Sequence, residues 1–193
     1  RGATNSLNSN TTDAEVATES NGYTSAFASD GFTLTAGGNS IGDVNDSARS
    51  YVAWNWLAGG TASSNTDGSI TSSVSANTTS GFSIVSFTGT GANATVGHGL
   101  GSAPKMIVKV RDAANSWPCQ HISLGAGNRV NLDSTAASAS APTFWNSTEP
   151  TSSVFSVGTE DITNNSGNTF IAYCFAEKKG YSKFGSYTGN GNA

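Results

Sequence analysis

Two runs of alternating apolar and polar residues, at positions 82–87 and 105–110, most strongly constrain what this chain of 193 residues can fold into. Each run lies between Gly, Asn or Pro residues, and a glycine-rich connection joins them. Alternation of this kind, in segments of about 4–8 residues between turn formers, is typical of half-buried strands. Similar runs recur at positions 23–27, 32–34, 50–56, 117–124, 129–132, 143–145, 154–157 and 170–175. The pattern predicts an all-β protein.

The composition narrows the class of protein. Only 11% of the residues are charged, against about 25% in an average domain. Disordered chains combine low hydrophobicity with high net charge, whereas the apolar residues here come in regular patches. We therefore expect an ordered protein with a neutral Ser/Thr/Asn surface, a type common on extracellular and virion proteins.

Charge and hydropathy speak against two kinds of partner. The net charge is −4 and no lysine precedes Lys105, so the basic stripe of a nucleic-acid-binding protein is missing. No apolar run approaches the roughly 20 residues of a membrane-spanning helix. We expect neither nucleic acid nor membrane as a partner.

The two halves of the chain resemble each other in sequence. The segment from Asp30 through GDVNDSARSYVAWNW matches the segment from Ser152 through DITNNSGNTFIAYCF. Residues 82–89 are likewise repeated at 184–189. A period near 100 residues suits a β domain in tandem. We predict half a unit at 1–60, a complete β-sandwich unit at 81–183, and the first strand of a further unit at 184–193. The Ser/Thr-rich residues 61–80 between the units have the composition of a linker or of an exposed strand pair, and we assign them as a linker.

Few residues indicate catalysis or metal binding. His98, in VGHGLGSAPK, is either a metal ligand or general base, or a corner residue that bonds to backbone; the absence of a neighbouring acid or second His favours the corner. His121 lies on a predicted edge strand. Asp43, Asn45 and Asp46 resemble Ca²⁺ ligands but lack the later bidentate acid, which favours ordinary turns. We expect no enzyme activity, no metal and no cofactor.

The cysteines and the aromatic residues suggest hypotheses about a disulfide, the core and a glycan-binding site. Cys119 and Cys174 show no metal-ligand spacing, and a disulfide between them stays open. Trp54 and Trp56 alternate along a predicted strand, so we expect them in the core. Trp117 and Trp145, beside Pro118 and Asn146, are the better candidates for exposure. Trp117, Trp145 and Asn146 are therefore the predicted glycan-binding residues.

The motifs HGLGSAPK and IAYCFAEKKGYSKFGSYTGNG, with WNSTEPTSSVFSVG between them, resemble a repeat domain of marine bacteriophage structural proteins. The resemblance covers nearly the whole chain. It implies a lectin-like or jelly-roll antiparallel β-sandwich, assembly into a virion appendage, and attachment to a host-surface glycan. It transfers no catalytic or binding residue to this sequence.

Together these observations predict a non-enzymatic tail fibre, spike or capsid decoration of a phage particle, located on the virion. We expect it to self-associate as a homotrimer or fibre and to contact other virion proteins and a host polysaccharide. Phe184, Ser186 and Tyr187 lie on the predicted unpaired strand and are the expected intersubunit residues. The alternatives are a carbohydrate-binding module or lectin, and a cell-surface filament or adhesin subunit.

Overall fold

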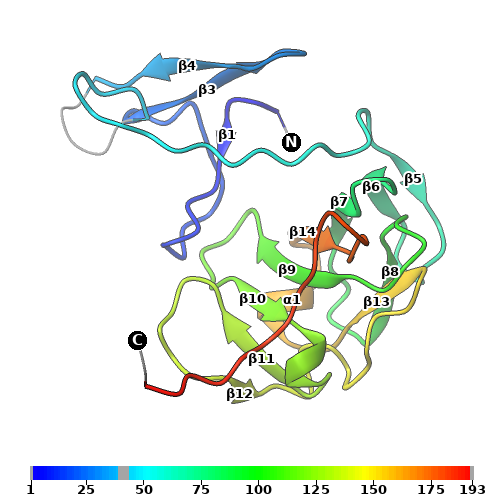
Figure 1. Cartoon of the computed structure of the whole chain (residues 1–193). Helices are drawn as coiled ribbons and strands as arrows, with labels where there is room; N and C mark the ends of the chain where they lie inside the picture. Colours follow the sequence, from blue (N-terminus) through cyan, green and yellow to red (C-terminus); the bar gives the residue numbers. More distant parts are fainter. Residues whose placement is uncertain (1, 39–43, 192–193) are drawn as a thin grey trace.

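The computed structural model describes residues 2–38 and 44–191, and most of its regular structure is antiparallel β-sheet (Figure 1). The all-β prediction is confirmed. An eight-stranded antiparallel sheet, here called the main sheet, forms the centre of the fold. Its strands, in spatial order, are β12 (Ala139–Ser140), β11 (Asn128–Asn131), β10 (Pro118–Gln120), β9 (Lys105–Val110), β14 (Thr169–Phe175), β7 (Phe82–Thr88), β6 (Ser72–Asn77) and β5 (Ser63–Asn65).

The central pair of the main sheet is β14 with β7. All seven residues of each strand are in register, from Thr169 opposite Thr88 to Phe175 opposite Phe82. Because side chains alternate across a strand, Ala172 and Tyr173 lie on opposite faces. Both faces of β14 carry large apolar side chains, so this strand needs cover on both sides.

The core lies on one face of the main sheet, here called the core face. β8 (Ala94–Gly97) and β13 (Val154–Val157) pair antiparallel and cover it. Phe87 stacks on Phe170 with ring centroids 5.3 Å apart and meets Phe155 edge-on at 6.0 Å. The core residues are Ile70, Val74, Val85, Phe87, Val96, Leu100, Trp145, Phe155, Val157, Phe170, Ala172, Cys174 and Ala176.

The side chain of Asn164 links two loops at one end of the main sheet and the β8–β13 pair. It is the last residue of a single helical turn, α1 (Asp161–Asn164), and is fully buried. Its Nδ2 donates to the carbonyl oxygens of Ala92 at 2.6 Å and Gly158 at 2.7 Å, and its Oδ1 accepts from the Thr90 backbone N–H at 2.9 Å. One side chain thus ties the loop between β7 and β8 to the loop that follows β13.

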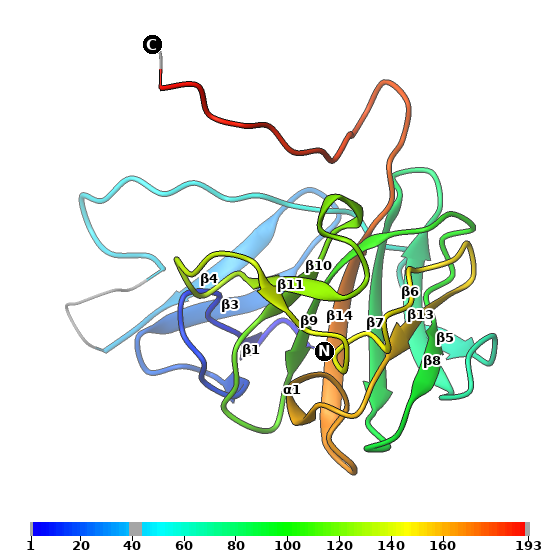
Figure 2. The ribbon, with the colours of Figure 1, turned by 90° about the horizontal axis from the view of Figure 1, so that it is seen from below.

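The N-terminal part forms two small antiparallel pairs beside the main sheet (Figures 1 and 2). β1 (Asn5–Ser6) pairs with β2 (Val16–Ala17), and β3 (Gly22–Phe27) forms a hairpin with β4 (Phe32–Ala36). Arg111 holds this part to the end of β9: its Nη2 and Nε donate to Glu15 at 2.7 and 3.2 Å. Its backbone carbonyl also accepts from the Glu15 N–H.

Three assignments of single segments are wrong. Residues 61–80 form a strand pair, the alternative that their composition left open, and not the linker assigned to them: they supply β5 and β6 of the main sheet, and β6 places Val74 in the core and small serines on the other face. Residues 143–145 lie in a turn rather than a strand. Residues 50–56 form no strand within the described chain, although their sequence alternates well. The division into repeat units and the jelly-roll topology stay predictions.

Candidate functional site

The second face of the main sheet, opposite the core face, is apolar at its centre. Phe82 and Ile84 of β7 lie opposite Phe175 and Tyr173 of β14. Trp117, just before β10, stacks on the Tyr173 ring at a centroid distance of 6.4 Å. This face therefore carries a continuous aromatic surface instead of the polar side chains expected on a solvated sheet face.

A groove of about 990 Å³ runs over this surface. We call it the aromatic groove; its aromatic lining residues are Trp54, Trp56, Phe82, Trp117, Tyr173, Phe175 and Phe184. Phe175 is at the centre of one ring cluster, with centroid distances of 5.0 Å to Phe82, 5.9 Å to Trp56 and 6.1 Å to Phe184. The volume falls within the roughly 300–1,000 Å³ of small-molecule sites.

Segments without strand structure and the N-terminal part both cover this face. Asn5 of β1 and Phe27 of β3 line a pocket with Ile171 and Tyr173 of β14. Residues 54–62 are held by hydrogen bonds from the Ser80 and Ser75 hydroxyls to the Leu57 and Gly60 carbonyls. Residues 184–186 line the groove from the other side. Trp54 keeps 78% of its surface exposed and Trp56 keeps 55%.

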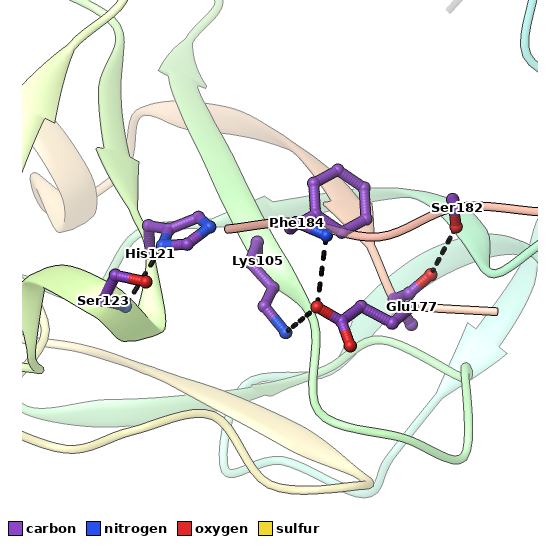
Figure 3. Close-up of polar contacts among 7 residues, drawn as sticks. Lys105, His121, Ser123, Glu177, Ser182 and Phe184 are labelled. Carbon is purple, nitrogen blue, oxygen red and sulfur yellow. Dashed lines mark hydrogen bonds and ion pairs between the residues drawn. The ribbon is translucent and has the colours of Figure 1, made fainter. Parts of the chain in front are cut away.

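The polar rim of the aromatic groove contains one ion pair and one histidine. Lys105 Nζ lies 3.8 Å from Glu177 Oε1, and the same oxygen accepts from the Phe184 backbone N–H at 3.1 Å (Figure 3). His121 Nδ1 accepts from the Ser123 N–H and so caps the short 3₁₀ helix Ile122–Leu124. Glu177 thereby fixes the start of the C-terminal tail beside the groove.

The structure reverses the expected exposure of the tryptophans. Trp117 and Trp145, predicted to be exposed, retain 4% and 0% of their surface. The turn at residues 142–147 folds Trp145 into the core face, while Asn146 adopts a left-handed φ of 50° and stays exposed. Buried rings offer no stacking platform. Trp54 and Trp56, predicted to be in the core, are exposed because residues 50–56 have no neighbouring strand.

The predicted intersubunit residues lie in the C-terminal tail. Phe184 is half-buried on Phe175, whereas Tyr187 has 94% of its surface exposed and Ser186 is also exposed. Residues 184–191 form no strand within the described chain. Positions 192–193 of the predicted strand lie outside the described residues.

His98 is a buried corner residue. It follows β8, between a Gly97 that ends the strand and a Gly99 with φ of 70°. Its Nδ1 accepts from the Leu100 N–H, and its Nε2 lies 3.2 Å from the Thr151 carbonyl. Both ring nitrogens of the neutral imidazole are thus used for backbone, which confirms the corner interpretation.

Stability should therefore fall in mild acid. Burial lowers the pKa of His98 and outweighs the hydrogen bond to Thr151 and the negative charge of Asp67, which act in the opposite direction. Protonation then favours the unfolded chain. The His98 contribution to the free energy of unfolding should be at its maximum above the ordinary histidine pKa of about 6.5 and should decrease as the pH falls below that value. The decrease is limited to about 1.4 kcal/mol per pH unit for one proton. Urea unfolding between pH 7.5 and 5 measures it.

Two variants isolate the His98 contribution. His98→Gln should flatten the pH dependence, whereas the matched variant His121→Gln should retain it. Equal slopes in wild type and His98→Gln would contradict the assignment.

The cysteines are free thiols, Cys174 buried and Cys119 partly buried. Burial raises the pKa of Cys119 to about 11 and that of Cys174 to about 12. Both therefore remain protonated near neutral pH, where a thiol is a poor nucleophile.

The described residues contain no cluster for a metal ion and no helix for crossing a membrane. Asp43 of the predicted acidic loop lies outside the described residues, and Asp46 forms an ion pair with Arg49 at 2.6 Å. Within residues 2–38 and 44–191, no group of three or more His, Cys, Asp or Glu side chains is placed to hold a metal ion. Among the same residues, no helix is long and apolar enough to cross a bilayer.

The fold and the groove define an all-β protein whose main sheet carries a core on one face and an aromatic groove on the other. The chain belongs to the family DUF7483, a domain of unknown function, which matches residues 1–193. Neither the curated proteins nor the solved structures contain a match to it.

Proposed function

We propose that this protein is a non-enzymatic structural protein of a bacteriophage particle, acting as a tail fibre, spike or capsid decoration. The aromatic groove carries the proposal: it lies on an apolar sheet face, it is lined in part by segments without strand structure, and its Trp54 and Trp56 remain exposed. Continuous apolar surface of this kind marks association with another macromolecule. The low charge content and the resemblance to phage structural repeats add support.

Assembly is part of the proposal. The protein would be a unit of a tandem β-sandwich array, with a homotrimer as first choice, and would contact other virion proteins. Burial of Trp54 and Trp56 between copies would remove apolar surface from water, which stabilises the assembly by about 25 cal/mol for each Å² buried. The virion is the proposed location.

Immunogold electron microscopy of particles purified from the native source tests the proposal. Gold should label appendages or the surface of phage particles, and peptides of the chain should co-purify with them. Antibody pre-absorbed with the recombinant protein is the control. Label on cell-surface filaments but not on particles would contradict the proposal and favour the filament or adhesin alternative. Turnover of a polysaccharide would contradict the non-enzymatic part.

A carbohydrate-binding module is the second candidate, favoured by the two exposed tryptophans that line one groove. Aromatic rings beside polar groups suit sugar stacking, and Lys105 and His121 supply polar groups at the rim. Isothermal titration with host-surface polysaccharide tests it. Binding should be lost in Trp54→Ala and retained in Tyr187→Ala, whose exposed ring is not among the groove-lining residues. Equal affinity in both variants would contradict the groove as the sugar site.

A further inference from the structure

We propose that the aromatic groove binds an amphiphilic carboxylate, a molecule with one carboxylate and an unbranched alkyl chain, as in a fatty acid. The carboxylate would lie between His121 and Lys105, and the alkyl chain would extend over the rings of Phe175 and Phe82. The inference goes beyond the proposed structural role, which requires no ligand. Three features support it: a row of side chains across four strands, two hydrogen-bond donors at one end of that row, and apolar side chains along the rest.

Four groove-lining side chains form a row across the main sheet. Phe82 of β7 lies opposite Phe175 of β14, and Phe175 lies opposite Lys105 of β9. The register of β9 with β10, continued by one residue, places His121 opposite Lys105, because His121 keeps an extended backbone with φ of −144° and ψ of 137°. Neighbouring strands lie about 4.8 Å apart, so the row from His121 to Phe82 spans about 14 Å.

Lys105 supplies a cation at the polar end of the row. Its side chain keeps only 15% of its surface exposed, and its Nζ lies 3.8 Å from Glu177 Oε1. This distance exceeds the upper limit of about 3.2 Å for an N–H···O hydrogen bond. The Glu177 oxygen accepts instead from the Phe184 N–H. Glu177 therefore leaves the donors of the ammonium group for a ligand oxygen, with which they would form a strong, charge-assisted hydrogen bond.

His121 supplies a second donor beside Lys105. Its Nδ1 accepts from the Ser123 N–H at 3.1 Å, so the neutral ring carries its proton on Nε2. Figure 3 shows this second nitrogen pointing away from Ser123, towards Lys105 and Phe184. A carboxylate has two oxygens and can accept from Nε2 and from the ammonium group together. No Asp or Glu is among the described residues that line the groove, so the charge there favours an anion.

The rest of the row suits an alkyl chain better than a sugar. The Phe82 and Phe175 ring centroids lie 5.0 Å apart, and Ile84 lines the groove beside them. A sugar ring carries several hydroxyl groups, each of which would lose water without gaining a hydrogen-bond partner on phenylalanine or isoleucine. An alkyl chain has no such cost and gains from burial. Mostly apolar walls with a few placed polar groups are typical of small-molecule sites.

Isothermal titration of the protein with dodecanoate, decanoate and octanoate tests the ligand class, at concentrations below those at which micelles form. One molecule should bind per protein chain, and affinity should fall about three- to fourfold for each methylene removed. Dodecyltrimethylammonium has the same alkyl chain on a cation and should bind roughly tenfold more weakly than dodecanoate. Equal affinity for the two head groups would overturn carboxylate recognition. Tighter binding of a neutral oligosaccharide than of dodecanoate would overturn the ligand class and favour the carbohydrate candidate.

Substitutions of the two donors test the carboxylate site. Lys105→Met keeps a long side chain without the charge and should weaken dodecanoate binding roughly tenfold, whereas Lys179→Met, at an exposed lysine outside the groove lining, should not. His121→Asn retains an acceptor for the Ser123 N–H, because Asn is a favoured N-cap, but removes the Nε2 donor. It should weaken binding roughly fivefold. Unchanged affinity for dodecanoate in Lys105→Met or in His121→Asn would overturn the site.

Substitution of Trp56 tests the position of the alkyl chain. Its ring centroid lies 5.9 Å from Phe175 and 6.4 Å from Phe82, at the apolar end of the row. Trp56→Ala should therefore weaken dodecanoate roughly tenfold and octanoate, whose shorter alkyl chain ends nearer to the carboxylate, by less than about threefold. Tyr187→Ala, at an exposed ring outside the groove lining, should change neither. Equal losses for the two ligands in Trp56→Ala would overturn the direction of the alkyl chain. Particle labelling decides the structural role independently of these titrations.

Discussion

Replacement of Asn164 by alanine is expected to lower the free energy of unfolding by about 3–5 kcal/mol, because each buried polar group left without its hydrogen bond costs about 1–3 kcal/mol. The Thr90 N–H and the Ala92 and Gly158 carbonyls would all lose their partner. Asn164 is fully buried, so a cavity would form as well. Urea unfolding followed by tryptophan fluorescence measures the loss.

Two variants separate this role from a general effect of the turn. Asn165→Ala, one residue further along and only partly buried, should cost under about 1 kcal/mol. Asn164→Asp keeps the acceptor for Thr90 but points a carboxylate oxygen at two carbonyls. That repulsion raises the pKa of the introduced carboxyl, so part of the lost stability should return as pH falls and the group protonates. A loss below about 1 kcal/mol in Asn164→Ala would contradict the assignment.

Replacement of Trp145 by alanine should also cost about 3–5 kcal/mol, the range for removal of a large aromatic side chain from a core. Trp145 has no exposed surface and lies in the same cluster as Phe155 and Phe170. Thermal and urea unfolding measure the effect. The expectation matters because sequence patterning alone predicts an exposed ring that is dispensable for folding.

The controls for Trp145 follow from its contacts. Its Nε1 has no hydrogen-bond partner in the described part of the chain, so Trp145→Phe sacrifices volume but no hydrogen bond and should cost less than half as much as alanine. Trp54→Ala, at a highly exposed position, should change the stability of the monomer by under about 0.5 kcal/mol. A larger loss from Trp54→Ala than from Trp145→Ala would restore the sequence-based assignment.

Strand positions with strict alternation were predictable from sequence. The predicted segment at 105–110 coincides with β9, and 154–157 coincides with β13. In both cases a short run rich in β-branched residues follows a Pro or Ser, and the strand has neighbours to pair with. The pattern indicates which side chains of a strand would face the core. It therefore predicts a strand correctly where neighbouring strands are present to pair with.

The same pattern failed where pairing decided the outcome. Residues 50–56 alternate as well as β14 does but form no strand, because a strand needs a hydrogen-bonding neighbour that sequence cannot display. β6 shows the opposite error: its serines resemble a linker, yet a single valine in the core and a position next to β7 make it a strand.

The candidate site was less predictable than the fold. Aromatic residues were visible in the sequence, but their exposure depends on which face of which sheet is covered, and by what. The turn at residues 142–147 buries Trp145, whereas Trp54 lies in a segment that forms no strand and stays exposed. One signal was available: Phe82 and Phe175 flank apolar residues on both alternating positions of their strands, which indicates that both faces of the central pair require cover.

Strand length across the main sheet carries one more consequence. The two central strands, β7 and β14, have seven residues each, whereas β5 at one border has three and β12 at the other has two. A border this short presents few open backbone groups, so one copy is a poor template for stacking another edge to edge into an aggregate. We therefore do not expect copies of this chain to associate through the borders of the main sheet.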